Sequence, residues 1–171
     1  MSISKRGQVW VTDFILSLLI IVVALAIFGR AILNITSANQ DVRPLIMEGR
    51  SFSDSLISEG YPVDWNSSSV SRIGLTADKR INDTKISAFY AMDYDDVKER
   101  FNSRYDFYVF MVGYDNKLIN VSGKYGLGHG LVNATQDSVV LSGLDFDRLV
   151  KIERLTIYDS KIVRLVIYIW K

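Results

Sequence analysis

A single apolar segment near the N-terminus constrains this chain more than any other feature. Residues 14–28 read FILSLLIIVVALAIF, and Ser17 is the only polar residue among them. With the apolar residues on either side, the segment approaches the about 20 residues that a helix needs to span a bilayer. Lys5 and Arg6 precede it, and positive charges before a span favour a cytoplasmic N-terminus. We therefore expect one membrane-competent helix at residues 9–33, with the rest of the chain outside the cell.

Three interpretations of this segment are open. The first is a cleaved signal peptide, because Ala24-Leu25-Ala26 has the small residues of a cleavage site. That site would lie inside the apolar run, however, since Ile27 and Phe28 continue it. The second is a signal anchor that is never cut. The third depends on residues 5–8, which read Lys-Arg-Gly-Gln: a basic pair, a glycine, and a glutamine that opens the helix.

The third arrangement resembles the class III leader of archaeal type IV pilins. The resemblance is close from the basic pair to the end of the apolar run, and extends loosely to the layout of a helix followed by strands. It implies cleavage between Gly7 and Gln8 on the cytoplasmic side, with the apolar helix kept on the mature protein. The family often has Ser at the third mature position and Glu at the fifth. This chain has Trp10 and Thr12 there, with Asp13 one place later.

The resemblance implies a structural subunit of a surface filament, a pilus-like assembly involved in cell adhesion. Such a subunit waits in the membrane, is cut by a prepilin peptidase, and then enters the filament. An assembly ATPase and a membrane platform drive that step. Its partners in the filament are copies of itself or other pilins, which pack through their apolar helices. The alternative function is a glycosylated surface protein with a single membrane span. Its head would act as a binding module, and the protein would not polymerise.

Cleavage would change the charges at the start of the helix. Loss of Lys5 and Arg6 takes the net charge from +1 to −1 and removes two cations from a dry helix bundle. The new amine at Gln8 needs an anionic partner. Asp13 is the only acid before Asp41, so we assign that role to Asp13. The competing interpretation is a carboxylate that rests at the inner membrane surface.

Five N-x-Ser/Thr sequons support an extracellular location. They lie at Asn34, Asn66, Asn82, Asn120 and Asn133, all after the apolar run. About one would be expected by chance from this composition. We therefore predict N-glycosylation at several of them, and least at Asn34, which lies next to the membrane. Turn chemistry is the alternative explanation, because Asn and Ser both favour turns.

The helical pattern continues beyond the apolar run. Apolar residues recur at spacings of three and four with charged residues between them, which predicts an amphipathic half at residues 34–59. Pro44 should kink it or interrupt one hydrogen bond. The predicted organisation is a leader at 1–7, one long helix at 8–59, and an extracellular β-rich head at 60–171.

The head sequence predicts short strands and one broken helix, so the fold class is α+β. The expected type IV pilin-like architecture is a long, partly transmembrane helix followed by an antiparallel sheet. The patterns predict strands at 72–75, 105–112, 118–122 and 138–141, a helix at 84–101 broken near Asp93, and a C-terminal hairpin of 149–158 and 162–170. The alternating apolar residues of the last strand predict cover on both of its faces.

Catalytic chemistry has little support in this sequence. There is no cysteine and only one histidine, which removes disulfides, cysteine metal sites and most Ser-His chemistry. The glycine-rich residues 126–130 lack the Lys-Ser/Thr of a phosphate loop and predict a flexible turn. The charge balance, 20 basic against 19 acidic residues, argues against nucleic-acid binding. We expect no enzyme activity and no cofactor.

Overall fold

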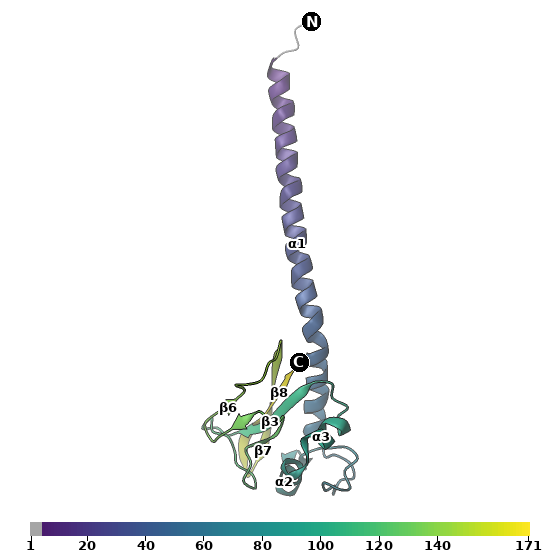
Figure 1. Ribbon diagram of the computed structural model, residues 1–171, viewed down its shortest axis with the longest axis vertical. Helices are drawn as coiled ribbons and strands as arrows, with labels where there is room; N and C mark the ends of the chain where they lie inside the picture. The colour runs from purple at the N-terminus through teal and green to yellow at the C-terminus, as the bar shows by residue number, and fades with distance from the viewer. Residues whose placement is uncertain (1–4) are drawn as a thin grey trace. The chain divides into compact units, whose positions relative to one another are not determined.

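The computed structural model describes the backbone of residues 5–171 and the side chains of residues 10–31 and 42–171. It consists of an N-terminal apolar helix followed by antiparallel sheets, which confirms the α+β class (Figure 1). The elements are α1 (Lys5–Leu56), β1 (Thr76–Ala77), β2 (Arg80–Ile81), α2 (Asp83–Ala91), α3 (Tyr94–Arg100), β3 (Asp106–Val112), β4 (Gly126–Gly128), β5 (Asn133–Ala134), β6 (Val139–Val140), β7 (Leu149–Tyr158) and β8 (Lys161–Trp170). The chain divides into two compact units between Val42 and Arg43.

The second unit is built around a four-stranded antiparallel sheet in the order β4-β3-β8-β7. The predicted C-terminal hairpin is confirmed, and β7 pairs with β8 along its whole length. Asp159 and Ser160 connect the two strands with φ values of 47° and 57°. Two central residues with positive φ are typical of the tight turn whose twist matches paired strands. This turn fixes the register of the two longest strands.

Both faces of the sheet are covered, as the pattern of the last strand predicts. On one face, Leu165, Ile167 and Ile169 of β8 pack in a core with the end of α1, α2 and α3. On the other face, Val166 and Trp170 pack in a second core under the segments that follow β3. The prediction is wrong at the start of β8, where Ile162 is 68% exposed. The reason is that the second core reaches β8 only from Val166 onward, so this face is uncovered at Ile162, whereas Val163 on the opposite face is buried.

The final turns of α1 belong to the core of the second unit. Leu45, Phe52 and Leu56 are all at least 97% buried, as expected for the apolar stripe of an amphipathic helix. The Phe52 ring lies 3.9 Å from that of Phe101 and 4.6 Å from that of Phe107. The end of α1 therefore forms one side of this aromatic part of the core.

Gly60 follows the helix and holds a position that only glycine fits. Its φ is +76°, and a Cβ there would lie 2.7 Å from the carbonyl oxygen of Arg72. A side chain would therefore be strained in conformation and would also collide with the backbone.

The predicted break in the second helix is confirmed. Helix α2 ends at Ala91 and α3 begins at Tyr94. Asp93 lies between them, and its side chain accepts a hydrogen bond of 2.9 Å from the backbone N–H of Asp95. A carboxylate at this position satisfies one of the N–H groups that the first helical turn leaves free.

Two strand predictions are wrong, and one predicted turn is a strand. The neighbour of β3 along the sheet edge is β4, from the glycine-rich segment, and residues 118–122 meet the end of β3 only through the isolated bridge of Val112 with Leu118. A Cβ atom at Gly126 would lie 2.5 Å from the carbonyl oxygen of Val109. A Cβ atom at Gly128 would collide with the carbonyl oxygen of Phe107. Glycine thus allows a close strand approach here. Residues 72–75 form only an isolated bridge, Tyr61 with Arg72.

The packing of α1 predicts where the head can be cut. A fragment of residues 43–171 keeps Leu45, Phe52 and Leu56, whereas a fragment of residues 60–171 loses all three. Each buried Leu or Phe removed costs roughly 2–5 kcal/mol, against a total stability of about 5–15 kcal/mol for a typical domain. We expect the longer fragment to melt cooperatively by circular dichroism and the shorter one to show no cooperative transition.

Phe52→Ala in the longer fragment is an intermediate case, which should lower the free energy of unfolding by about 3–5 kcal/mol. Cooperative melting of 60–171 at the temperature of 43–171 would contradict this role for the helix.

Candidate functional site

The described side chains of the first unit form a long, exposed apolar surface. Residues Trp10–Ala31 form a helix of 22 residues that is long and apolar enough to cross a membrane, and none of it is buried. Trp10 is 79% exposed and Phe28 is 71% exposed. A helix that is apolar on all sides needs lipid or protein around it. A membrane anchor and a signal sequence share these properties, so the surface identifies a possible transmembrane helix.

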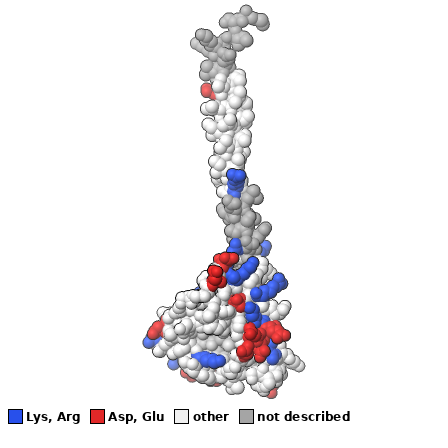
Figure 2. Space-filling view, in the orientation of Figure 1, with Lys and Arg blue, Asp and Glu red and all other residues white. Residues whose placement is uncertain are grey.

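Charges mark the two ends of this span. Asp13 and Arg30 are its only charged residues, and Figure 2 shows the visible face between them as uncharged. They are separated by about 25 Å of helical rise, close to the thickness of about 30 Å of a bilayer's hydrocarbon core. Trp10 precedes Asp13, where an aromatic ring suits the membrane–water interface. The span therefore has the length, the polar ends and the aromatic residue that a lipid-embedded helix needs.

The residues assigned to leader cleavage are Gly7 and Gln8. They lie outside the residues whose side chains the structure describes. Asp13 is described and is exposed. Its pairing with a new amine at Gln8 therefore stays a prediction, and so does the cleavage itself.

Small residues lie along one side of the same helix. Ser17, Ala24 and Ala31 are seven residues apart, which places them on nearly one face. All three are exposed. Small side chains let two helices approach closely in a membrane, where the hydrophobic effect does not drive association. This face is therefore a suitable contact for a second apolar helix.

Three of the five sequons are at exposed asparagines of the second unit: Asn66, Asn120 and Asn133. The Asn66 Oδ1 accepts hydrogen bonds from the backbone N–H and the hydroxyl of Ser68, at 3.0 and 2.9 Å. These contacts leave the Asn66 amide nitrogen, the atom that carries an N-linked glycan, unused. All three positions are accessible to modification, which stays a prediction.

The other two sequons differ. Asn82 is half-buried and caps α2, where its Oδ1 accepts a hydrogen bond of 3.1 Å from the backbone N–H of Lys85. A glycan on the amide nitrogen would leave that oxygen in place. Asn34 lies outside the residues whose side chains the structure describes.

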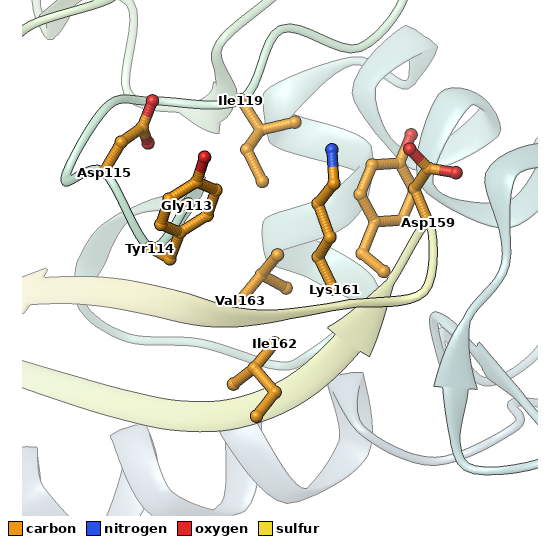
Figure 3. Close-up of a pocket in the computed structure, with 9 residues that line it drawn as sticks. Gly113, Tyr114, Asp115, Ile119, Asp159, Lys161, Ile162 and Val163 are labelled. Atoms are coloured by element: carbon orange, nitrogen blue, oxygen red, sulfur yellow. The ribbon is translucent and has the colours of Figure 1, made fainter.

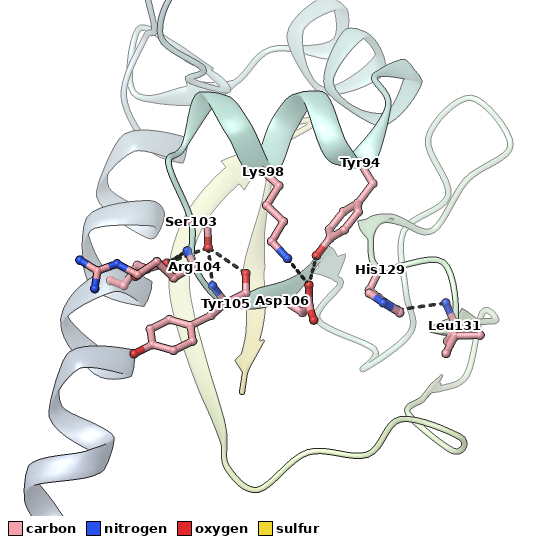
Figure 4. A network of polar contacts seen from close by, with 9 residues as sticks. Tyr94, Lys98, Ser103, Arg104, Tyr105, Asp106, His129 and Leu131 are labelled. Carbon is pink, nitrogen blue, oxygen red and sulfur yellow. Dashed lines mark hydrogen bonds and ion pairs between the residues drawn. The ribbon is translucent and has the colours of Figure 1, made fainter.

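A polar network joins α3 to the sheet (Figure 4). The Tyr94 hydroxyl donates to Asp106 at 2.6 Å, and the Lys98 ammonium lies 2.5 Å from the same carboxylate oxygen. The His129 ring packs edge-on against Tyr94 at 5.8 Å between centroids. Its Nδ1 accepts the N–H of Leu131. Each of these four side chains makes a polar or ring contact within the protein, which is typical of a structural contact.

The pKa values agree with a structural role. Burial opposes ionisation of Asp106, but the hydrogen bonds from Lys98 and Tyr94 outweigh it and hold the pKa of the carboxyl below its usual range. Burial and the hydrogen bond to Asp106 raise the pKa of Tyr94 far above that of a free tyrosine. At neutral pH the network therefore keeps a charged Asp106 and a neutral Tyr94.

A second set of polar contacts lies within the second unit and involves the final turns of α1. The Glu48 carboxylate accepts hydrogen bonds from the Ser103 hydroxyl at 2.7 Å and the Arg104 N–H at 2.9 Å. Arg154 of β7 donates to the Ser53 hydroxyl at 3.0 Å and to Asp54 at 2.6 Å. These bonds link the end of the helix to the segment after α3 and to β7.

In the part of the chain that the structure describes, no three His, Asp or Glu side chains converge as a metal site requires. The acidic residues near 93–96 start α3, as the sequence predicts for a solvated helix start.

No family model, curated protein or solved structure matches this chain.

Proposed function

We propose that this chain is a structural subunit of an archaeal type IV pilus-like surface filament. The observation that carries the proposal is the span Trp10–Ala31, which is apolar on all sides, exposed throughout and part of the same helix α1 that ends at the buried Leu56. The resemblance at residues 5–8 adds the leader. One continuous helix then serves as a membrane segment before assembly and as a core segment afterwards.

Transfer of the helix between these two environments yields little net hydrophobic free energy. Lipid tails and a bundle of apolar helices are equally dry, so burial does not favour one strongly over the other. Assembly must then rest on close packing, for which Ser17, Ala24 and Ala31 offer a suitable face, and on an external motor. A prepilin peptidase, an assembly ATPase and a membrane platform are the partners that the resemblance implies.

The proposal places residues after the span outside the cell. Arg30 lies at the outer end of the span, and Lys5 and Arg6 lie on the inner side. The exposed sequons at Asn66, Asn120 and Asn133 suit an extracellular, glycosylated head, and none of these residues is needed for the core.

The decisive measurement is the mass of the mature N-terminus in native membranes and in filaments sheared from the cells. A chain that begins at Gln8 in both fractions is the expected result. A start at Met1 would favour the uncut membrane anchor, and a start at Ile27 would favour a cleaved signal peptide. Cells that make the processed chain but yield no filament containing it would contradict the polymer and leave a non-polymerising surface protein.

A further inference from the structure

A small cavity lies where the sheet loses one of its strands. Strand β3 stops pairing at Val112, whereas the β7–β8 hairpin continues beyond it. A cavity of about 200 Å³ fills the gap between this hairpin and the turn after β3. Figure 3 shows Tyr114 on one side of it and Lys161 and Asp159 on the other. The site is wholly within the second unit.

The cavity combines an apolar base with an exposed aromatic ring. Val163 is 97% buried and Ile119 is half-buried, and both line it. Tyr114 is 82% exposed, the largest exposed fraction among the large hydrophobic side chains that the structure describes. A flat ring held in water beside an apolar base is a surface on which a ligand can stack.

Two charged side chains at the edge of the cavity have no partner within the described protein. Within the described residues, the Lys161 ammonium and the Asp159 carboxylate form no hydrogen bond and no ion pair. Asp115 accepts one bond, of 3.2 Å, from the Lys117 N–H through Oδ1. The site therefore offers one strong donor and two carboxylates at the edge of the ring-and-aliphatic surface.

The backbone adds a further donor and acceptor. Tyr158 and Lys161 close a two-residue turn, so their backbone groups bond to each other and those of Ile162 point away from β7. They face the side on which β3 would lie if it continued past Val112. Along β8, which the structure describes in full, only Ile162 has free backbone groups on this side, since Arg164 already pairs with β3.

These groups together select the class of ligand. An added peptide strand would need several free backbone positions, and the gap offers one. A phosphate or other anion would meet two carboxylates beside a single lysine. A sugar ring fits better, because its C–H face stacks on an aromatic side chain while its hydroxyls donate to carboxylates and accept from an ammonium. The volume is below the roughly 300–1,000 Å³ of sites for drug-sized ligands, which suits one ring.

We propose that this cavity binds one pyranose ring of a neutral saccharide, held between the Tyr114 ring and the polar groups of Asp159 and Lys161. The site requires neither leader cleavage nor polymerisation, so it stands independently of the proposed function. Two sources of the sugar share this chemistry. One is a glycan on a foreign surface, and the other is the glycan predicted at Asn120, the residue next to Ile119.

The test uses the full chain, produced without glycosylation and held in lipid nanodiscs. Detergents with maltose or glucose head groups are avoided because they would compete. Methyl glycosides of glucose, galactose and mannose are the probes, followed by saturation-transfer NMR and calorimetry. We expect at least one to bind, and Tyr114→Ala to weaken binding by at least about tenfold. Tyr114→Phe keeps the ring and should bind within a few-fold of the unaltered chain.

Matched aspartate variants test the polar contact. Asp159→Asn removes a charge but keeps the turn, because Asn tolerates positive φ. Asp78→Asn is its control, since Asp78 also has positive φ, 48°, in a two-residue turn but lies outside this cavity. We expect weaker binding only for Asp159→Asn. Failure of all three neutral glycosides to bind would overturn the proposal, as would binding that Tyr114→Ala leaves unchanged. Binding of methyl glucuronide alone would indicate an anion site and would overturn it too.

A last comparison identifies the source of the sugar. If no glycan of the chain occupies the cavity, the native glycosylated protein should bind the same glycosides as the unglycosylated chain. If instead Asn120→Gln restores binding that the native protein lacks, the chain's own glycan fills the cavity. Either result is consistent with a saccharide site, and loss of binding in the native protein that Asn120→Gln fails to restore contradicts it.

Discussion

Replacing Gly7 with Leu should leave the precursor uncut and abolish the filament. The class III leader that residues 5–8 resemble is cut directly after the glycine, and a bulky side chain there would block the peptidase. The uncut chain keeps Lys5 and Arg6. Two cations cannot enter a dry bundle without partners, because burying an unpaired charge costs several kcal/mol even after relaxation. Mass spectrometry of membranes should therefore find the chain intact from Met1 and no subunit in the sheared fraction.

Gly29→Leu is the matched control for cleavage. Gly29 is in the same helix, and a Cβ there meets nothing within 4 Å. The substitution adds the same apolar side chain far from the leader, so the mature protein should still begin at Gln8. Cleavage of Gly7→Leu at the normal position would remove the leader from the mechanism, and an uncut Gly29→Leu chain would show that the assay reports insertion and not leader recognition.

Asp13→Asn should spare insertion and cleavage but reduce the filament yield by at least about tenfold. Cleavage gives Gln8 a free amine, and a helix bundle would bury it. Asp13 lies five residues farther along, about 7.5 Å of rise. Its short side chain makes contact within one helix awkward, so the carboxylate of a neighbouring subunit, displaced by about one turn, is the more suitable partner. Without it the buried amine is unpaired.

The comparison needs a variant that keeps the charge. Asp13→Glu retains the carboxylate on a longer side chain and should assemble, so the ratio of sheared filament to membrane-bound subunit separates charge from sterics. A membrane anchor predicts no difference between the variants, because Asn at an interface costs no more than Asp. Equal filament yields from Asp13→Asn and the unaltered chain would exclude Asp13 as the partner of the amine.

Local signals in the sequence predicted the elements whose cause is local. The apolar run has no alternative to a helix of its length, and Asp93 caps α3 through its own side chain. Asp159 and Ser160 tolerate the positive φ that joins β7 to β8. Each depends on neighbours within a few residues of the chain, which is the range over which sequence patterns carry information.

Sequence patterns do not predict contacts between residues that are far apart in the chain. The glycine-rich segment predicted a turn, but Gly126 and Gly128 are glycines because the backbone of β3 approaches them closely. Tyr94 and Asp106 each look unremarkable in the sequence, and only folding brings the hydroxyl within 2.6 Å of the carboxylate. The candidate sugar site is similar, since Tyr114 and Lys161 line one cavity only because β3 ends before β8 does.

The sequence by itself determined that this protein has one membrane-competent apolar helix with charges at its ends, followed by an α+β head whose last two strands form a hairpin. These properties follow from composition and short-range periodicity, which survive without any tertiary contact. The tertiary structure alone decided that the Phe52 ring meets those of Phe101 and Phe107, that β4 pairs with β3, and that Ile162 is exposed. Such features depend on which distant segments pack together and exclude water. This packing is defined only once the whole domain has folded.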